Sequence, residues 1–173
     1  MAGGANVLSA NALYAILPEG TLNLDGYSNQ VQSIDNAGTL RLAGAPERTG
    51  NRLFTGAYTS HGGRLILNTV LGNDESMTDR LVADSITLDS APTRILINNS
   101  GGTGALTQSN GIMIVQALDA AQSAANAFTL DQRIITGAYE YDLYQGGIGA
   151  SAGDGNWYLR SIAAPRPETG VYL

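Results

Sequence analysis

The residues best suited to chemistry in this sequence are one histidine and a scatter of carboxylates. His61 is the sole histidine and directly follows Ser60, so the pair has the residue types of a nucleophile and its base. Adjacent residues on a strand point to opposite faces, and the sequence has no Gly-x-Ser-x-Gly elbow. We therefore interpret His61 as a turn residue ahead of Gly62-Gly63 and predict no catalytic residue.

Neither the acidic residues nor the glycines have the spacing of a known ligand site. Asp74, Glu75 and Asp79 form the densest acidic group, but their spacing differs from that of a calcium loop. A solvated turn is the preferred interpretation. The run Gly101-Gly102-Thr103-Gly104 lacks the lysine of a phosphate loop and is interpreted as a turn. We predict no metal ligand and no cofactor-binding residue.

A β-helix enzyme that degrades polysaccharides is the main catalytic alternative. Glycoside hydrolysis needs two carboxylates about 5–10 Å apart, and the sequence leaves open whether Asp84 and Asp89 or others meet across neighbouring strands. The acidic and basic residues nevertheless occur singly in predicted turns, and there is no lysine. These features favour a protein that is not an enzyme.

Aromatic residues gather near the end of the chain. Strict alternation from Gly137 to Tyr144 places Tyr139, Tyr141 and Leu143 on one face of a strand, and a glycine-rich loop then leads to a second strand around Trp157. Such rings can stack on sugars, but packing in a β-hairpin that caps a stack is favoured. The residues predicted to be critical for this cap are Tyr139, Tyr141, Leu143, Tyr144, Trp157, Tyr158 and Leu159.

Composition indicates a β protein and excludes several partners. The 173 residues include 22 glycines and five prolines, with 43% hydrophobic and only 14% charged residues. A net charge of −6 without a basic cluster argues against nucleic acid. There is no cysteine, no apolar run near the roughly 20 residues that span a bilayer, and no signal peptide pattern. We expect either a cytosolic protein or an excised piece of a longer exported chain.

A short unit recurs and sets the predicted fold. Gly-x-Leu-x-Leu occurs at residues 20–24, 38–42 and 63–67, with both leucines on one strand face. A repeat near 20 residues cannot bury its apolar face alone, so it must stack on its neighbours. The predicted fold is all-β, a right-handed parallel β-helix closed by a C-terminal β-hairpin cap. Residues 6–17 are interpreted as a first rung, and their apolar spacing would also suit a short helix. A sandwich, the alternative, would show turns every 8–12 residues.

The predicted organisation has three parts. Residues 1–115 form β-helix rungs, and residues 116–164 form the capping segment, which starts with an alanine-rich loop or single helical turn. Residues 165–173, which contain Pro165, Arg166 and Pro167, form an extended arm because proline cannot continue a sheet.

Several ordered motifs lie between Gly56 and Arg166. They are Tyr58-Thr59-Ser60, Leu65-Ile66-Leu67-Asn68-Thr69, Asp79-Arg80-Leu81-Val82, Asn98-Asn99-Ser100-Gly101-Gly102, Gly137-Ala138-Tyr139-Glu140-Tyr141 and Asn156-Trp157-Tyr158-Leu159-Arg160. Together these motifs resemble the pertactin-like autochaperone or junction region of type V bacterial autotransporters. The first third of the chain resembles this family only in its pattern of short predicted strands and turns.

The resemblance implies a role and a location. It implies a non-catalytic region that nucleates β-helix folding and promotes passage of the passenger across the outer membrane. The implied partners are upstream passenger rungs, a downstream β-barrel translocator, periplasmic chaperones and the outer-membrane assembly machinery. The implied location is the bacterial cell surface, outer membrane or exterior, reached through the periplasm, with this chain a soluble excised fragment. An adhesive module of a surface virulence protein that binds host ligands is the alternative.

Overall fold

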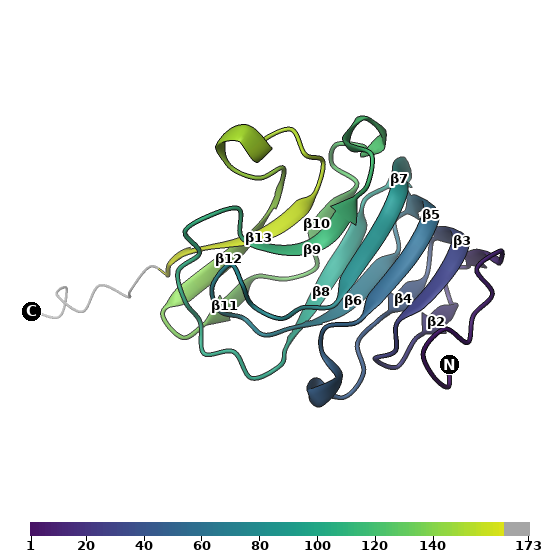
Figure 1. Cartoon of the computed structure of the whole chain (residues 1–173), viewed down its shortest axis with the longest axis horizontal. Coiled ribbons are helices and arrows are strands. Elements are labelled where there is room, and N and C mark those ends of the chain that lie inside the picture. Colours follow the sequence, from purple (N-terminus) through teal and green to yellow (C-terminus); the bar gives the residue numbers. More distant parts are fainter. Residues whose placement is uncertain (165–173) are drawn as a thin grey trace, which may run out of the picture.

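The first ten strands of the chain alternate between two sheets (Figure 1). The computed structural model describes residues 1–164. In the first part of the chain, one sheet holds β1 (Leu13–Ile16), β3 (Asn29–Asn36), β5 (Arg52–His61), β7 (Arg80–Ala91) and β9 (Ile112–Ala117), and the other holds β2 (Thr21–Asn23), β4 (Thr39–Arg41), β6 (Arg64–Thr69), β8 (Thr93–Asn99) and β10 (Phe128–Leu130). The later strands are β11 (Ile134–Thr136), β12 (Tyr139–Gln145) and β13 (Trp157–Ala163).

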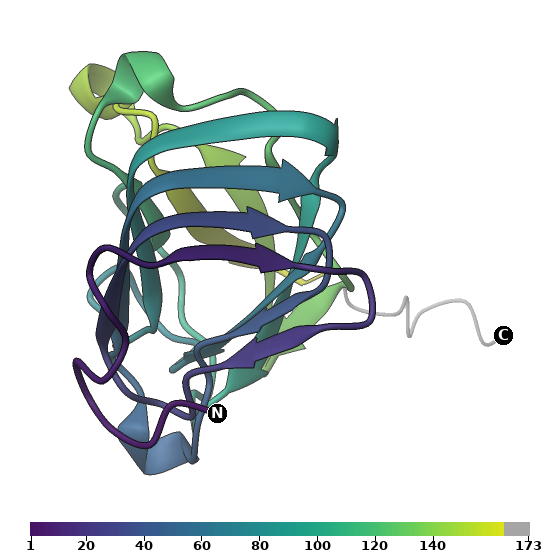
Figure 2. The same ribbon diagram turned by 90° about the vertical axis from the view of Figure 1, so that its right-hand side faces the viewer.

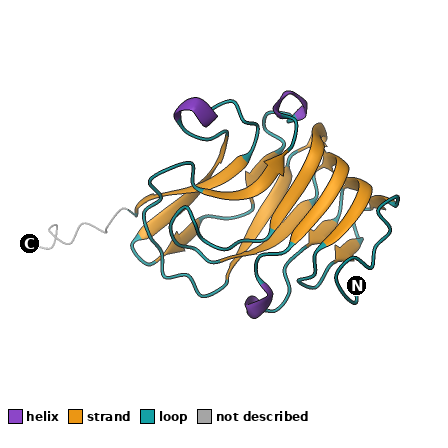
Figure 3. Cartoon of the chain, in the orientation of Figure 1, coloured by secondary structure: helices purple, strands orange, loops and turns teal. Residues whose placement is uncertain are grey.

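The described residues are therefore almost entirely strands and loops, as Figure 3 shows. Three short 3-10 turns, η1 (Pro46–Arg48), η2 (Ala120–Gln122) and η3 (Gly149–Ser151), are the helical elements of residues 1–164. The predicted all-β class is confirmed. The two sheets remain separate, and no strand pairing in residues 1–164 closes them into one continuous surface.

All pairings among β1 to β10 are parallel, and their register follows the sequence repeat. Leu22, Leu40 and Leu65, from the three Gly-x-Leu-x-Leu units, are register partners on β2, β4 and β6. The strands therefore lie one above another as layers, which Figure 2 shows in the view turned by 90°. The predicted stacking of the repeats is confirmed, and β1 lies inside the predicted first rung.

The core is made by side chains that repeat in register along each sheet. Ile34, Tyr58 and Ile86 occupy equivalent positions on β3, β5 and β7, and each is at most 1% exposed. Leu40 and Leu65 face them from the other sheet and are fully buried. Each such leucine contributes about 1.5–3 kcal/mol through burial, so the apolar ladders hold the layers together.

One polar network crosses the interior between the sheets. The Tyr58 hydroxyl lies 2.6 Å from the Thr93 hydroxyl and accepts a hydrogen bond from Asn36 Nδ2 at 3.1 Å. Ser60 Oγ lies 2.7 Å from the Thr93 hydroxyl. Burial raises the pKa of Tyr58 to about 12, against the smaller opposing effect of its hydrogen bonds to Thr93 and Asn36. The network joins β3 and β5 to β8.

The chain reverses its pairing pattern after β10. Strands β11, β12 and β13 pair antiparallel with one another, and β13 also pairs antiparallel with β9. The predicted hairpin is present as β12 and β13 and is extended by β11. Parallel pairing continues past residue 115, because β10 pairs with β8 inside the predicted capping segment. The predicted arm at 165–173 lies outside the described residues.

Candidate functional site

The antiparallel strands β11 to β13, residues 134–163, form a unit that covers one end of the parallel stack (Figure 1). We call it the antiparallel unit. The seven residues predicted to be critical lie on β12 and β13. Four are buried, namely Tyr141, Trp157, Tyr158 and Leu159, while Tyr139 and Leu143 are partly buried against the core and Tyr144 is 42% exposed. The predicted common face of Tyr139, Tyr141 and Leu143 therefore points inward.

Tyr144 differs from the other six residues. Its ring lies at the surface, with the Arg160 guanidinium 4.2 Å from the ring centroid. Such an exposed cation–π contact contributes about 0.5–1 kcal/mol. Tyr144 therefore supports the outer surface of the unit, and it serves as a natural control for the buried positions.

A row of buried aromatic rings runs from the parallel stack into the antiparallel unit. Tyr58 on β5 stacks on Phe128 on β10, with ring centroids 5.5 Å apart. Phe128 meets Trp157 on β13 edge to face, with centroids 5.3 Å apart and an angle of 75°. Offset and edge-to-face arrangements are the favourable ones for aromatic pairs. The row makes the packing of β13 continuous with that of β5.

The Tyr141 hydroxyl fixes two loops at once. It donates to the carbonyl of Gly72, 2.8 Å away, and accepts from the backbone N–H of Ala105 at 3.0 Å. Burial raises the pKa of the Tyr141 hydroxyl, and the hydrogen bond with the Ala105 backbone acts in the opposite direction. One side chain of β12 therefore holds the turn after β6 and the segment after β8.

That segment, residues 102–111, has no strand of its own, and we call it the strap. Thr107 and Ser161 exchange hydrogen bonds: the Thr107 N–H donates to Ser161 Oγ at 2.8 Å, and the Ser161 N–H donates to Thr107 Oγ1 at 2.9 Å. Ser161 Oγ also donates to the Ala105 carbonyl at 2.7 Å. Gly101–Gly104 was predicted as a turn, and the structure shows that the chain continues from it into this longer strap.

Asp74 anchors the far half of the strap. Its carboxylate accepts from the backbone N–H groups of Gln108, Ser109 and Gly111 at 2.7, 2.9 and 2.8 Å. Partial burial acts to raise the pKa of Asp74, but the combined backbone donors, Gln108 first, lower it below its ordinary value. The interpretation of this residue as part of a solvated turn missed its contacts, which join positions more than 30 residues apart in the chain.

Asp79 contradicts the solvated-turn interpretation more strongly, because it is fully buried. Its oxygens accept from the backbone N–H groups of Gly50 and Asn51 at 3.0 Å and of Asn68 at 2.8 Å. A buried carboxylate needs such partners to offset its lost hydration. Nothing in the local sequence distinguishes Asp79 from its exposed neighbour Glu75, so the burial of Asp79 could not be predicted from the sequence.

The remaining candidates for chemistry lie apart from one another. Ser60 is buried and donates to the Ala91 carbonyl at 2.7 Å, whereas His61 Nδ1 lies 3.0 Å from Asp89 at the surface. Asp84 and Asp89 are both exposed on β7, separated by five residues of strand, or roughly 16 Å. In residues 1–164, no three His, Cys, Asp or Glu side chains are grouped so as to hold a metal ion.

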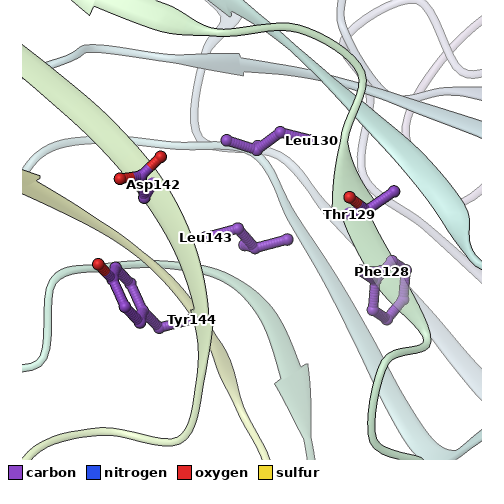
Figure 4. Close-up of a pocket in the computed structure, with 6 residues that line it drawn as sticks. All are labelled: Phe128, Thr129, Leu130, Asp142, Leu143 and Tyr144. Atoms are coloured by element: carbon purple, nitrogen blue, oxygen red, sulfur yellow. The ribbon is translucent and has the colours of Figure 1, made fainter.

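An open groove of about 390 Å³ separates β10 from β12. Figure 4 shows Leu130 and Leu143 extending into it from the two strands. Its lining residues are Phe128, Thr129, Leu130, Asp142, Leu143 and Tyr144. Asp142 is the one carboxylate of this lining, whereas glycoside hydrolysis in most families uses two. The groove therefore does not supply the predicted alternative chemistry.

Comparison with known proteins identifies the class. The family model described as Autochaperone Domain Type 1 matches residues 29–143, about two thirds of the chain. The chain belongs to this family. The predicted resemblance to the autochaperone region of autotransporters is confirmed, and the match begins at Asn29, well before the predicted start at Gly56.

Similar proteins include named autotransporters. The chain is 37% identical over 96% of its length to the adhesin BmaC autotransporter of Brucella suis, and 35% identical over 73% of its length to the autotransporter adhesin AIDA-I of Escherichia coli. It is also 37% identical over 95% of its length to the uncharacterized protein YuaQ of Escherichia coli. The chain spans only 5%, 10% and 11% of BmaC, AIDA-I and YuaQ.

These relatives associate the chain with the bacterial surface or outer membrane. Within residues 1–164, no helix has both the length and the apolar character needed to cross a membrane.

Proposed function

We propose that this region is the non-catalytic folding nucleus of an autotransporter passenger. In this role the antiparallel unit forms early, and the parallel layers then add in the direction of β1 and β2. Folding outside the cell opposes backward sliding of the chain and so promotes passage of the passenger across the outer membrane. The partners in this proposal are upstream passenger layers, the translocator, periplasmic chaperones and the outer-membrane assembly machinery.

The physical basis is the cost of starting a one-dimensional stack. Its first layer has no neighbour, whereas every later layer gains an interface. A unit that is stable through its own antiparallel pairing lowers this cost. We further propose that the strands coil as a right-handed β-helix, since connections between parallel strands of one sheet, such as β1 to β3, are right-handed in nearly all proteins.

The observation that carries the proposal is the contrast between the two ends of the stack. At one end, Trp157 is buried against Phe128, and Tyr141 and Ser161 bind the strap. At the other end, β1 and β2 are each the terminal strand of their sheet, and the N-terminal segment contacts β2 through a backbone hydrogen bond from the Ala2 N–H to the Asn23 carbonyl at 2.7 Å without adding a strand. A strand edge that lacks a paired neighbouring strand is a template for a further strand. This contrast supports the addition of layers at the end formed by β1 and β2.

Surface display of a full-length autotransporter carrying this region tests the proposal. Leu159→Ser places a hydroxyl in the buried centre of the antiparallel unit, so surface display is expected to fall at least fivefold, measured by labelling intact cells. Trp157→Ser should act in the same way. The matched control is Tyr144→Ser, on the exposed side, which should leave display unchanged. Normal export of both buried variants would overturn the proposal.

An adhesive role is the second candidate, because two relatives are named adhesins. The outer face of β5 offers a groove of about 300 Å³ that includes Phe54 and Leu118, which are 43% and 57% exposed. Exposed apolar side chains in a concave site are typical of binding surfaces. Saturable binding of the chain to host cells, lost in Phe54→Ser, would support this role. An absence of saturable binding would exclude it.

A further inference from the structure

The strap, residues 102–111, is bonded to the parallel stack near both of its ends. The Gly104 N–H donates to the Leu71 carbonyl at 2.9 Å, and the Gly102 N–H donates to Asn99 Oδ1 at 2.8 Å. Asn99 Oδ1 also accepts from the Leu71 N–H at 3.2 Å. Asp74 then binds three N–H groups of residues 108–111. All these partners belong to β8 or to the loop between β6 and β7.

The same strap is bonded to the antiparallel unit through different positions. Tyr141 binds the backbone of Ala105, and Ser161 binds Ala105 and Thr107. Asn110 is also bonded to the antiparallel unit, because its carbonyl accepts from the Arg160 guanidinium at 3.1 Å and its Oδ1 accepts from the Ile148 N–H at 2.8 Å. Positions bonded to the stack and positions bonded to the antiparallel unit therefore alternate along the strap. A backbone N–H or carbonyl group of the strap that loses its partner destabilises the docked arrangement, because that hydrogen bond is no longer made. Strap docking thus depends on both regions being in place.

Backbone contacts make this fit specific. Gly104 has φ = +82°, and a Cβ at this position would collide with the carbonyl oxygen of Thr136. Gly111 has φ = +99°, and a Cβ there would collide with the carbonyl oxygen of Leu159. Positive φ already favours glycine, and the close approach leaves no room for a side chain. The strap therefore lies directly against the strands of the antiparallel unit.

We infer that the strap is a coupling element that makes the parallel stack and the antiparallel unit fold and unfold together. Asp74, on the stack, and Ser161, on the antiparallel unit, share no hydrogen bond with each other, but both hold the strap. Loss of either anchor releases the strap. The contribution of the other anchor to the stability of the fold then becomes smaller, because the strap that it binds is no longer docked. The inference deepens the proposed function and rests on it for its biological meaning, since a nucleus must transmit its stability to the layers that follow.

A double-mutant cycle on the full 173-residue chain tests the coupling. Asp74→Asn, Ser161→Ala and the double variant are compared with the unchanged chain by urea unfolding. If the two anchors acted independently, the free-energy losses of the two single variants would add in the double variant. Because both anchors act through the strap, the double variant should lose less than this sum, and its folding equilibrium constant should be at least about threefold higher than the additive value. The control cycle pairs Asp74→Asn with Ser60→Ala, whose partners Ala91 and Thr93 lie outside the strap, and should be additive.

Amide hydrogen exchange gives a second measurement, which does not require that all variants unfold in urea with the same cooperativity. Ser161→Ala should speed exchange at Ser109 and Gly111, which bond to Asp74 and not to Ser161, by at least about threefold. Additive free energies together with unchanged exchange at these two amides would overturn the inference. If coupling is measured but the Leu159→Ser and Trp157→Ser proteins are both displayed normally, the strap inference stands and the proposed function is refuted. If the free energies are additive and the two buried variants are not displayed, the proposed function stands and the strap inference is refuted.

Discussion

The parallel stack and its junction with the antiparallel unit are held together in different ways. In the stack, equivalent residues repeat in register, as Leu22, Leu40 and Leu65 do, and each layer meets the next through the same apolar contacts. At the junction nothing repeats. Single polar side chains, such as Asp74, Tyr141 and Ser161, each bind a particular stretch of backbone.

The difference bears on specificity. The repeated apolar contacts alone would tolerate a shift of the stack by one whole layer, because leucine then meets leucine again. Buried polar contacts that do not repeat, such as those of Tyr58 and Asp79, oppose such a shift inside the stack. A junction made of single side-chain contacts has one arrangement that satisfies every partner. We therefore expect the stack to supply most of the buried area, and the junction to fix where the stack begins.

The largest effect on stability should come from the aromatic row that connects the two regions. Trp157→Ala removes a side chain that is only 4% exposed and leaves a cavity beside Phe128, so unfolding should become easier by about 3–5 kcal/mol. Urea unfolding followed by circular dichroism measures this. Tyr144→Ala, the exposed control, should cost less than about 1 kcal/mol. Equal losses would show that the row does not connect the regions.

Asp79 should dominate the polar contributions within the stack. Asp79→Ala leaves the N–H groups of Gly50, Asn51 and Asn68 without an acceptor, and at about 1 kcal/mol or more for each group the loss should be near 3 kcal/mol. The exposed Glu75→Ala serves as the control and should change stability by less than about 0.5 kcal/mol. If Asp79→Ala were as stable as this control, the three contacts would not matter.

Alkaline pH should weaken the stack through Tyr58. Its folded pKa of about 12 lies above the ordinary value of 10.0, so the unfolded chain loses its proton first. The stabilisation is fully present below pH 10 and is lost as pH rises towards 12, with a total of about 3 kcal/mol in order of magnitude. Stability measured from pH 9 to 11.5 should fall less steeply in Tyr58→Phe. An unchanged slope in that variant would contradict the role given to Tyr58.

Acid should weaken the junction through Asp74, with the smallest effect. The folded pKa of this carboxyl is lowered, so its contribution is present above the unfolded pKa near 4 and is lost as pH falls through the folded value. Unfolding measured between pH 5 and pH 2.5 should show a shallower decline in Asp74→Asn than in the unchanged chain. The same slope in both proteins would remove Asp74 from the acid response.

The repeats and the aromatic alternation could be predicted from the sequence because each pattern involves residues that are close together in the chain. Gly-x-Leu-x-Leu fixes which face of each short strand is apolar, and the Tyr139, Tyr141 and Leu143 pattern does the same for β12. Both patterns involve residues two apart. They predicted the all-β class, the stacking of the repeats and the inward face of the hairpin.

The strap and its anchors could not be predicted in this way. Asp74 and Gly111 are 37 residues apart, and Thr107 and Ser161 are 54 apart. No spacing rule links such positions, because their contact depends on how every intervening layer packs. Tyr144 was predicted to be critical for the cap, and the alternation of the strand turns it away from the face of Tyr141, so that it is 42% exposed.

Refolding kinetics test most directly whether the antiparallel unit forms before the stack. Leu159→Ala in β13 and Leu40→Ala in β4 remove the same side chain from two fully buried positions, so each should destabilise the chain by about 2–5 kcal/mol. If the unit is the nucleus, Leu159→Ala slows refolding with a φ-value above about 0.5, while Leu40→Ala mainly speeds unfolding with a φ-value near zero. The reverse pattern, with slow refolding for Leu40→Ala alone, would contradict the account.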